Sequence, residues 1–487
     1  MSMRNKLFSG VILIFWLFGG LFALSQSEKD RSVFYDYGKR FYFETHTLPV
    51  NTGDSINILT LFRISNSLLS FTKNGKGYSA FPQVELEYRD SNEIIKKRLV
   101  WKDTIIVIDY NDTKQKSAYN FGNVTAKLPT GKYKLNILLT DNGKNQIREI
   151  KHIIPKTSFA AEGNFSLPFF FRKDVKGNAG QLVPFVFDND IDFCNSPVSV
   201  YCIVSSGDTA MSFNYFFKYL SKRQNVTEWA PLLNFNLVDA HSFSILGKSK
   251  ENAGQTGRDS AVYFSGVTKI IPFKSLALNV SNDNKQLEFN EINFEWQNGT
   301  NRNLFIGLVK FEIPPEYIVP GNYSLLLWAG KKKDTTENEF KIEWEDMPLS
   351  LKNPEYASEL MFNILDDKEF KELRSGSKGE IFNNIIKYWK KNDPSPYSPF
   401  NEAMAEYFRR VDYSFFNFQT IREPDGAKTE RGKIFILQGA PDKIKRDMNS
   451  SGIINEVWTY SRLKQNFVFE TSSNGEFFLK QIDEIKK

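Results

Sequence analysis

The sequence predicts a multidomain, mainly β protein with two immunoglobulin-like β-sandwich domains, a helical segment and a small C-terminal α+β domain. The 487 residues exceed what one hydrophobic core needs. Aromatic residues make up 15% of the chain, which favours half-buried sheet surfaces. The character of the sequence changes near Glu345, after which apolar residues recur at helical spacing. The expected segments are a signal peptide (1–25), two sandwiches (26–156 and 157–345), a helical segment (346–422) and the C-terminal domain (423–487).

The N-terminus has the pattern of a secretory signal peptide. Arg4 and Lys6 precede an apolar run from Val11 to Leu24, and Ala23 and Ser25 place small residues before a cleavage point. The alternative is an uncleaved membrane anchor, but the run has about 14 residues where a membrane span needs about 20. We therefore expect an exported protein, periplasmic, outer-membrane-associated or secreted, with no integral membrane span in the mature chain.

Alternating segments between turns predict the strands of the first sandwich. Asn-Gly, Gly-Lys-Gly and Asp-Asn-Gly sequences separate several of them, and none shows a convincing helical stripe. The expected strands include Phe41–Thr45, Ser55–Ile64, Phe81–Tyr88, Thr104–Asp109 and Tyr133–Thr140.

One local pattern occurs twice. Leu128–Tyr133 and Val319–Tyr323 both contain a proline, a glycine and then a tyrosine that begins an apolar strand. In β-sandwiches such a corner feeds a terminal strand while the tyrosine hydroxyl bonds to backbone, so the repeat predicts a second sandwich; chance in a tyrosine-rich chain is the alternative. Within this sandwich we expect a helix at Ala210–Leu220 and an exposed loop at Lys248–Asp259.

Three helices should follow the second sandwich. Asn353 before Pro354 predicts the first start, with helix from Glu355 to Leu365; Ser377 predicts the second and Asn401 the third.

The C-terminal domain should be built from short strands. Ile434–Leu437 reads as a buried strand between two glycine turns. Trp458 and Tyr460 should share one face of a second strand, and Phe467 and Phe469 one face of a third.

Composition gives no sign of a metal, a cofactor or nucleic acid. The net charge of +6 is small for this length. His46, His152 and His241 are not spaced for zinc or a catalytic triad, so we expect solvated or hydrogen-bonded histidines. Cys194 and Cys202 could form a disulfide or remain two buried thiols. No catalytic residue is predicted.

Several segments resemble the GWxTD domain of exported bacterial proteins. They are Tyr388–Pro396, Asn401–Glu402, Glu406–Val411, Gly426–Ile436, Gly439–Asp442 and Glu456–Tyr460. At the positions that name the motif, Ala427 replaces the tryptophan and Glu430 replaces the aspartate. The resemblance implies an extracytoplasmic protein and supplies no catalytic residues. The candidate residues it marks, here called the motif residues, are Trp389, Asp393, Pro394, Asn401, Glu402, Arg410, Gly426, Thr429, Arg431, Gly432, Gly439, Pro441, Asp442, Trp458 and Tyr460.

The Arg409–Arg410 pair and Arg431 could bind an acidic partner or a phosphate. We favour structural roles, in which Arg431 orders the turn before the expected strand by bonding carbonyls or a helix carboxylate, and Arg410 pairs with a nearby Asp or Glu. For the whole chain we expect a non-enzymatic scaffold that contacts envelope proteins. The alternatives are a hydrolase of envelope polymers with facing carboxylates, and a glycan-binding module with exposed rings at Trp101, Trp229 or Trp328.

Overall fold

A computed structural model describes most of the chain and divides it into two compact units. The first unit comprises 1–166, 186–188 and 273–306, and the second comprises the remainder. The expected signal peptide, Trp229, His241 and the Lys248–Asp259 loop lie outside the described residues. The described ranges are 40–48, 55–75, 77–115, 118–141, 145–154, 163–173, 182–206, 212–220, 262–272, 279–282, 285–288, 305–329, 335–450, 452–472 and 475–485.

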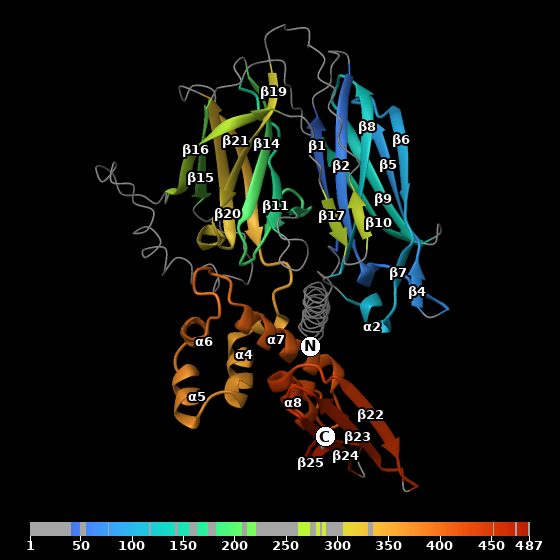
Figure 1. Cartoon of the computed structure of the whole chain (residues 1–487), viewed down its shortest axis with the longest axis vertical. Coiled ribbons are helices and arrows are strands. Elements are labelled where there is room, and N and C mark those ends of the chain that lie inside the picture. The colour runs from blue at the N-terminus through green and yellow to red at the C-terminus, as the bar shows by residue number, and fades with distance from the viewer. Residues whose placement is uncertain are drawn as a thin grey trace, which may run out of the picture. The chain divides into compact units, whose positions relative to one another are not determined.

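Two antiparallel sheets form the first sandwich (Figure 1). One has the order β1 (Phe41–Leu48), β2 (Ser55–Ser65), β8 (Tyr119–Pro129), and the other the order β10 (Asn145–Ile153), β9 (Lys134–Asp141), β5 (Pro82–Arg89), β6 (Ile95–Lys102). A smaller sheet contains β3 (Thr72–Asn74), β4 (Gly77–Ala80) and β7 (Ile105–Val107). The short η2 (Asn66–Leu68) and α2 (Tyr110–Thr113) and the hairpin β17 (Asn279–Asn282) with β18 (Lys285–Glu288) complete the described elements of this unit.

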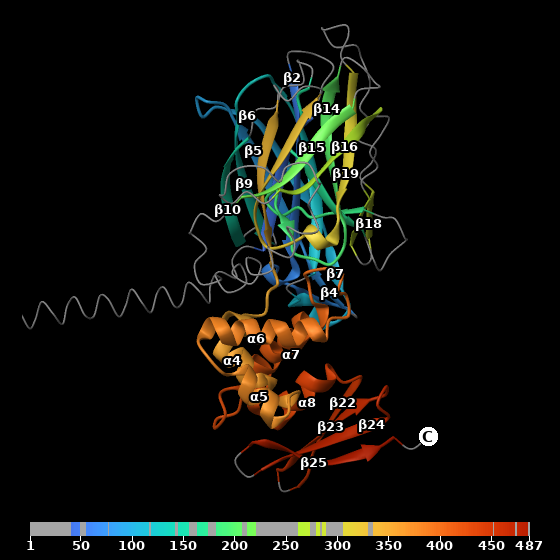
Figure 2. The ribbon, with the colours of Figure 1, turned by 90° about the vertical axis from the view of Figure 1, so that its left-hand side faces the viewer.

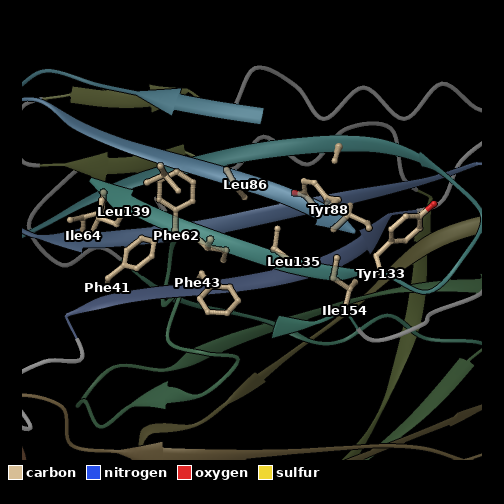
Figure 3. Packing of buried hydrophobic residues seen from close by; sticks show 14 of the residues in the cluster. Phe41, Phe43, Phe62, Ile64, Leu86, Tyr88, Tyr133, Leu135, Leu139 and Ile154 are labelled. Carbon is tan, nitrogen blue, oxygen red and sulfur yellow. The ribbon is translucent and has the colours of Figure 1, made fainter. Parts of the chain in front are cut away.

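The core of the first sandwich lies between its two sheets. Alternate residues of β5 and β9, such as Leu86 and Leu135, are completely buried, as strand periodicity requires. They pack against Phe43 and Phe62 from the facing sheet, and Figure 3 shows these side chains pointing into the shared interior. The mainly β class expected from the sequence is confirmed.

The second unit contains one nine-stranded sheet that folds back on itself. β16 connects its two layers, because it pairs with β15 over most of its length and with β19 through Ile270–Pro272. The rings of Phe170 (β11) and Phe340 (β21) lie 4.9 Å apart although five strands separate β11 from β21 in the sheet order. The order is β12 (Leu182–Pro184), β11 (Phe169–Lys173), β14 (Val198–Ser206), β19 (Phe305–Ile313), β16 (Val262–Pro272), β15 (Ser212–Leu220), β20 (Gly321–Ala329), β21 (Thr336–Glu343), β13 (Ile191–Asp192).

The helix expected at Ala210–Leu220 is wrong. Its described part, Ser212–Leu220, forms β15, which pairs with β16 on one side and β20 on the other. Its apolar residues occupy both faces because the strand is central, so alternation is hidden in the sequence. Phe213 and Phe217, four residues apart, are both completely buried, a spacing that fits a strand as well as a helix.

Both tyrosine corners are present. The Tyr133 hydroxyl donates to the Pro129 carbonyl at 2.8 Å, and the Tyr323 hydroxyl donates to the Val319 carbonyl at 2.6 Å. The expectation that each corner feeds the last strand is wrong, because β10 follows β9 and β21 follows β20. The first corner therefore leads into β9 and the second into β20, and in each case one more strand follows along the chain.

The helical segment begins after Trp344. Asn353, Ser377 and Asn401 cap the expected starts, which confirms them. The first helix ends at Leu360 and continues only as a 3-10 turn, so the extension to Leu365 is wrong. The elements are η3 (Pro315–Tyr317) before β20, then η4 (Leu349–Lys352), α4 (Pro354–Leu360), η5 (Met361–Asn363), α5 (Asp367–Leu373), α6 (Lys378–Lys391) and α7 (Glu402–Asn417).

The C-terminal part packs α8 against a four-stranded antiparallel sheet (Figure 2). The strand expected at Ile434–Leu437 is wrong, since these residues belong to α8 (Glu430–Gln438). Ile434 packs toward the sheet while Ile436 joins the helical core, so α8 buries both sides and shows no simple stripe. The remaining elements are η6 (Gly426–Lys428), β22 (Lys443–Met448), β23 (Ile454–Tyr460), β24 (Gln465–Thr471) and β25 (Phe477–Glu484).

Two further expectations can be checked. Cys194 and Cys202 are free thiols, so no disulfide joins them; Cys202 is buried as the alternative expected, whereas Cys194 is partly exposed. Complete burial raises the pKa of the Cys202 thiol. Trp458, Tyr460, Phe467 and Phe469 all join the core beneath α8, which confirms their shared faces. None of the described helices combines the length and apolar content needed to cross a bilayer.

Candidate functional site

The motif residues gather in two places within the second unit. One group lies where α6 ends and α7 begins, and the other surrounds α8 and the adjoining sheet. The first group is Trp389, Asp393, Pro394, Asn401 and Glu402. The second group is Arg410, Gly426, Thr429, Arg431, Gly432, Gly439, Pro441, Asp442, Trp458 and Tyr460.

Asn401 joins α6 to α7. Its Oδ1 accepts from the Met404 N–H at 2.8 Å, which caps α7, and its Nδ2 donates to the Trp389 carbonyl at 2.7 Å. The side chain is buried, so both bonds form where water cannot replace them. Trp389 itself packs in the helical core against Tyr407 and Phe408.

Two carboxylates lie beside this joint. Glu402 Oε1 accepts from the Ser395 hydroxyl at 2.7 Å and from the Asn195 amide. Asp393 Oδ1 accepts from the Ser395 N–H at 2.8 Å. Burial raises the pKa of the Asp393 carboxyl above its ordinary value, and the charge of Glu402 raises it further. Asp393 is therefore the carboxyl group among the motif residues whose pKa is raised.

Two glycines let backbone segments meet closely. A Cβ added to Gly426 would lie 2.2 Å from the Ser414 carbonyl oxygen at the end of α7. A Cβ added to Gly432 would lie 2.0 Å from the Gly426 carbonyl oxygen. Both distances are far below contact distance, so only glycine allows η6 to sit between α7 and α8.

The two ends of α8 are satisfied by motif side chains. Thr429 Oγ1 accepts from the Gly432 N–H at 3.1 Å and donates to the Gly426 carbonyl at 2.8 Å. At the other end, Gly439 has a φ of 81°, and its carbonyl accepts from the Tyr460 hydroxyl at 2.9 Å.

Arg410 also serves the end of α8. Its guanidinium lies 3.4 Å from the Ile436 carbonyl oxygen and 3.5 Å from that of Leu437, and its Nε donates to Glu406 at 2.8 Å. A cation at a helix C-terminus is favoured by the helix dipole. The expected pairing of Arg410 with a nearby acid is present, and that acid is Glu406.

Arg431 lies in a buried ionic cluster. Its guanidinium is 3.5 Å from Glu456 Oε1 and 3.8 Å from the centre of the Phe477 ring. Burial lowers the pKa of Arg431, while the nearby Glu456 opposes that shift. Glu456 also accepts from Trp458 Nε1 at 2.7 Å and from Arg446 Nε at 2.7 Å. Arg431 thus pairs with a carboxylate, but the expectation of a helix carboxylate is wrong, because Glu456 lies on the strand β23.

Asp442 and Pro441 form the turn between α8 and the sheet. Asp442 Oδ2 accepts from the Ser461 N–H at 2.6 Å, and this bond lowers the pKa of the carboxyl. The Asp442 N–H donates to the Thr459 carbonyl at 2.9 Å, so the turn is fixed to β23 from both sides.

Comparison with known families identifies this region. Residues 326–485 match the GWxTD domain family. The chain carries a GWxTD domain. The match starts within β20 and takes in β21, the helical segment and the final sheet. Comparisons with curated proteins and with solved structures found no match.

Sequence reasoning missed three carboxylates that hold the GWxTD domain together. Glu456 is the acid of the ionic cluster, and its position two residues before Trp458 on β23 is the signal that places it on the core face. Asp412 accepts from the Leu349 and Ser350 N–H groups at 2.5 and 2.9 Å. Asp425 accepts from the Tyr356 hydroxyl at 3.0 Å. The two residues are far apart in the sequence, so no local sequence pattern predicts this contact.

Ala427 and Glu430 occupy the two positions that depart from the motif name. The Ala427 methyl group is completely buried in the helical core of the GWxTD domain. Glu430 Oε2 accepts from the Leu479 N–H of β25 at 2.6 Å, so this carboxylate connects α8 to the sheet. Ala427 therefore contributes to core packing, and Glu430 contributes an exposed hydrogen bond between α8 and β25.

The described histidines are hydrogen-bonded side chains of the first sandwich. His152 Nε2 lies 3.1 Å from Thr45 Oγ1, and burial lowers the pKa of the imidazole. His46 is completely buried with Nε2 3.3 Å from Glu44 Oε2. Among the described residues, no group of three or more His, Cys, Asp or Glu could hold a metal ion.

Proposed function

We propose that this is an exported, non-enzymatic protein of the cell envelope, or a secreted one, that acts as a scaffold through protein contacts. The observation that carries this is the use of the motif residues inside the GWxTD domain. Asn401, Thr429, Arg410 and Tyr460 all direct polar atoms to backbone groups of the same domain. Side chains that bond the backbone of their own domain fix its fold, and a fixed surface is what a binding protein needs.

Exposed apolar side chains on and beyond α7 support a binding role. Tyr413 and Phe416 lie three residues apart on α7 and are 48% and 52% exposed, and Ile421 beyond the helix is 99% exposed. Aromatic rings of this kind are enriched at protein interfaces. The Tyr413 ring stacks on Phe435 at 4.5 Å, so it is presented in one fixed orientation.

Site-specific photo-crosslinking in the native cell tests the proposal. A photoreactive residue at Tyr413 should give a discrete adduct with an envelope protein, whereas one at Lys371 on the exposed side of α5 should not. The proposal is wrong if neither these nor other exposed positions of the sandwiches and GWxTD domain give an adduct. The expected signal peptide is tested separately, by an export reporter fused after residue 60 with and without the first 25 residues.

The Asp393 and Glu402 pair favours a hydrolase as the second candidate function. Its acid with a raised pKa and its adjacent carboxylate are what general acid catalysis would use. Replacing both by Asp393→Asn and Glu402→Gln separates the candidates, because a scaffold keeps its phenotype in the native cell while a hydrolase loses it. The glycan-binding alternative has less support, since the Trp101 ring packs edge-on against Phe62 at 5.0 Å.

A further inference from the structure

Among the described strands, β22 and β25 form the two edges of the final sheet of the GWxTD domain. At β25, the Leu479 N–H donates to Glu430 of α8, which occupies part of that edge. At the other end of the sheet order, β22 pairs with β23 and every residue of β22 is exposed. In an antiparallel pair alternate residues direct their N–H and C=O groups away from the partner, so β22 presents a row of backbone groups to an incoming strand.

A row of apolar side chains runs across the sheet from β24 to β22, and its members on β22 are exposed to solvent. Ile444 lies opposite Trp458, which lies opposite Phe467, so these three residues share the face that packs on α8. Trp458 is 1% exposed, yet Ile444 is 54% exposed, and Met448 on the same face of β22 is 71% exposed. One more strand beside β22 would cover both side chains.

The charged side chains of β22 determine which sign of charge an incoming strand should carry. The strand carries Lys443, Lys445 and Arg446 against Asp447, which leaves an excess of two positive charges. Lys445 lies 3.0 Å from Asp447 in an exposed pair, which contributes little to stability, whereas Arg446 bonds the buried Glu456 carboxylate.

A second copy of the chain does not fit this edge. Two-fold antiparallel pairing centred on Lys445 or on Arg446, the two middle residues of β22, would place that cation directly opposite its own counterpart. Like charges directly opposite each other destabilise a sheet. Lysines at a sheet edge prevent such self-association, and the same lysines attract a strand of opposite charge.

We propose that the β22 edge receives an acidic, extended segment of a partner protein as a fifth strand of the sheet. This inference rests on the proposed function in protein binding and names the surface and the chemistry of the partner. The segment would place apolar side chains beside Ile444 and Met448 and carboxylates beside Lys443 and Lys445. Backbone bonds would supply affinity and the alternating side chains would supply specificity.

A peptide-binding experiment with the full-length chain tests the pairing. The probe is a labelled ten-residue peptide of alternating glutamate and valine, followed by fluorescence anisotropy. Binding should weaken more than tenfold when all its backbone amides are methylated and more than tenfold when lysine replaces glutamate. No binding of the probe, or equal binding of either altered peptide, would overturn the proposal.

A charge-reversal variant distinguishes binding at the β22 edge from nonspecific attraction between an acidic peptide and a basic protein. The double variant Lys443→Glu/Lys445→Glu should lose the glutamate peptide more than tenfold and gain the lysine peptide, a gain that a misfolded chain would not show. The matched control Lys387→Glu/Lys391→Glu makes the same charge change on exposed residues of α6 and should bind as the unaltered chain does. Equal loss in the control would show attraction without a site and would reject the inference.

Photo-crosslinking separates this inference from the function on which it rests. An adduct from position 444 whose crosslinked segment is acidic and extended supports both. An adduct from Tyr413 with none from position 444 rejects the β22 edge and leaves the scaffold function standing. Absence of adducts from every exposed position tested rejects both.

Discussion

The first sandwich and the GWxTD domain are stabilised in different ways. In the sandwich, alternate apolar side chains such as Leu86 and Phe62 fill the space between two sheets, and shape is set by side-chain volume. In the GWxTD domain, Gly432, Asn401 and Arg431 act on backbone or on one buried carboxylate. A sandwich core can repack around volume-conserving changes. In the GWxTD domain, substitutions should be poorly tolerated at the few positions whose atoms bond one particular backbone group or carboxylate.

The largest effect is expected at Glu456. Glu456→Gln leaves the buried Arg431 guanidinium without a counter-charge, which should lower the free energy of unfolding by about 3 kcal/mol. The control Arg446→Gln removes the exposed partner of the same carboxylate and should cost less than about 1 kcal/mol. Hydrogen exchange of the α8 amides measures both, and similar losses would refute the buried-pair argument.

Gly432 should be next. Gly432→Ala places a methyl group 2.0 Å from the Gly426 carbonyl oxygen and should cost about 1–3 kcal/mol through overpacking. Gly379→Ala is the matched control, because an added Cβ there meets nothing within 4 Å. This control, in the first turn of α6, should stabilise by about 0.5–1 kcal/mol. Thermal unfolding of both variants would contradict the comparison if the two shifts had the same sign.

Asn401 tests the joint between α6 and α7. Asn401→Ala removes the α7 cap and the bond to the Trp389 carbonyl, so we expect a loss of about 1–2 kcal/mol. Asn417→Ala, at the exposed end of the same helix, should change stability by less than about 0.5 kcal/mol. Faster hydrogen exchange should appear at Met404 in the first variant alone.

The tyrosine corners show where the sandwiches use a side-chain-to-backbone bond of their own. Tyr323→Phe leaves the buried Val319 carbonyl without its donor and should cost about 1 kcal/mol. Tyr133→Phe should cost less, because the Pro129 bond is partly exposed and water can replace the hydroxyl. Denaturant unfolding measures both, and a larger loss for Tyr133→Phe would reverse the expected order.

The smallest effect concerns pH. Burial raises the pKa of Asp425 in the folded state, so its ionised form disfavours folding, and stability should increase as pH falls through that raised value. The Ser461 N–H lowers the pKa of Asp442, so its contribution should disappear as pH falls through that lowered value. Asp425→Asn and Asp442→Asn should therefore change the slope of stability between about pH 3 and 6 in opposite directions. Denaturant unfolding at several pH values measures these slopes. The prediction is contradicted if both variants have the same slope of stability against pH as the unaltered chain.

Local signals placed many elements correctly. The caps at Asn353, Ser377 and Asn401 start their helices because a side-chain oxygen accepts from the next turn. The tyrosine corners formed because proline, glycine and tyrosine specify a turn within a few residues. The positions of Trp458 and Tyr460 on one face followed from strand alternation.

Elements buried on both sides were misread. β15 and α8 each lie between two partners, so their apolar residues cover opposite faces and carry no readable period. The motif residues could be found by resemblance, but their partners could not. Asp425 with Tyr356, and Glu402 with Asn195, are joined across long stretches of chain.

By itself the sequence determined the mainly β class, the helix caps, the tyrosine corners and the presence of a GWxTD domain, because each depends on interactions within a few residues or on an ordered motif. Tertiary structure decided that one sheet of nine strands folds back through β16, that Arg431 lies against Glu456, and that β22 is left open at the sheet edge. These features depend on which distant segments meet, and contact between distant segments is set by the packing of the whole fold.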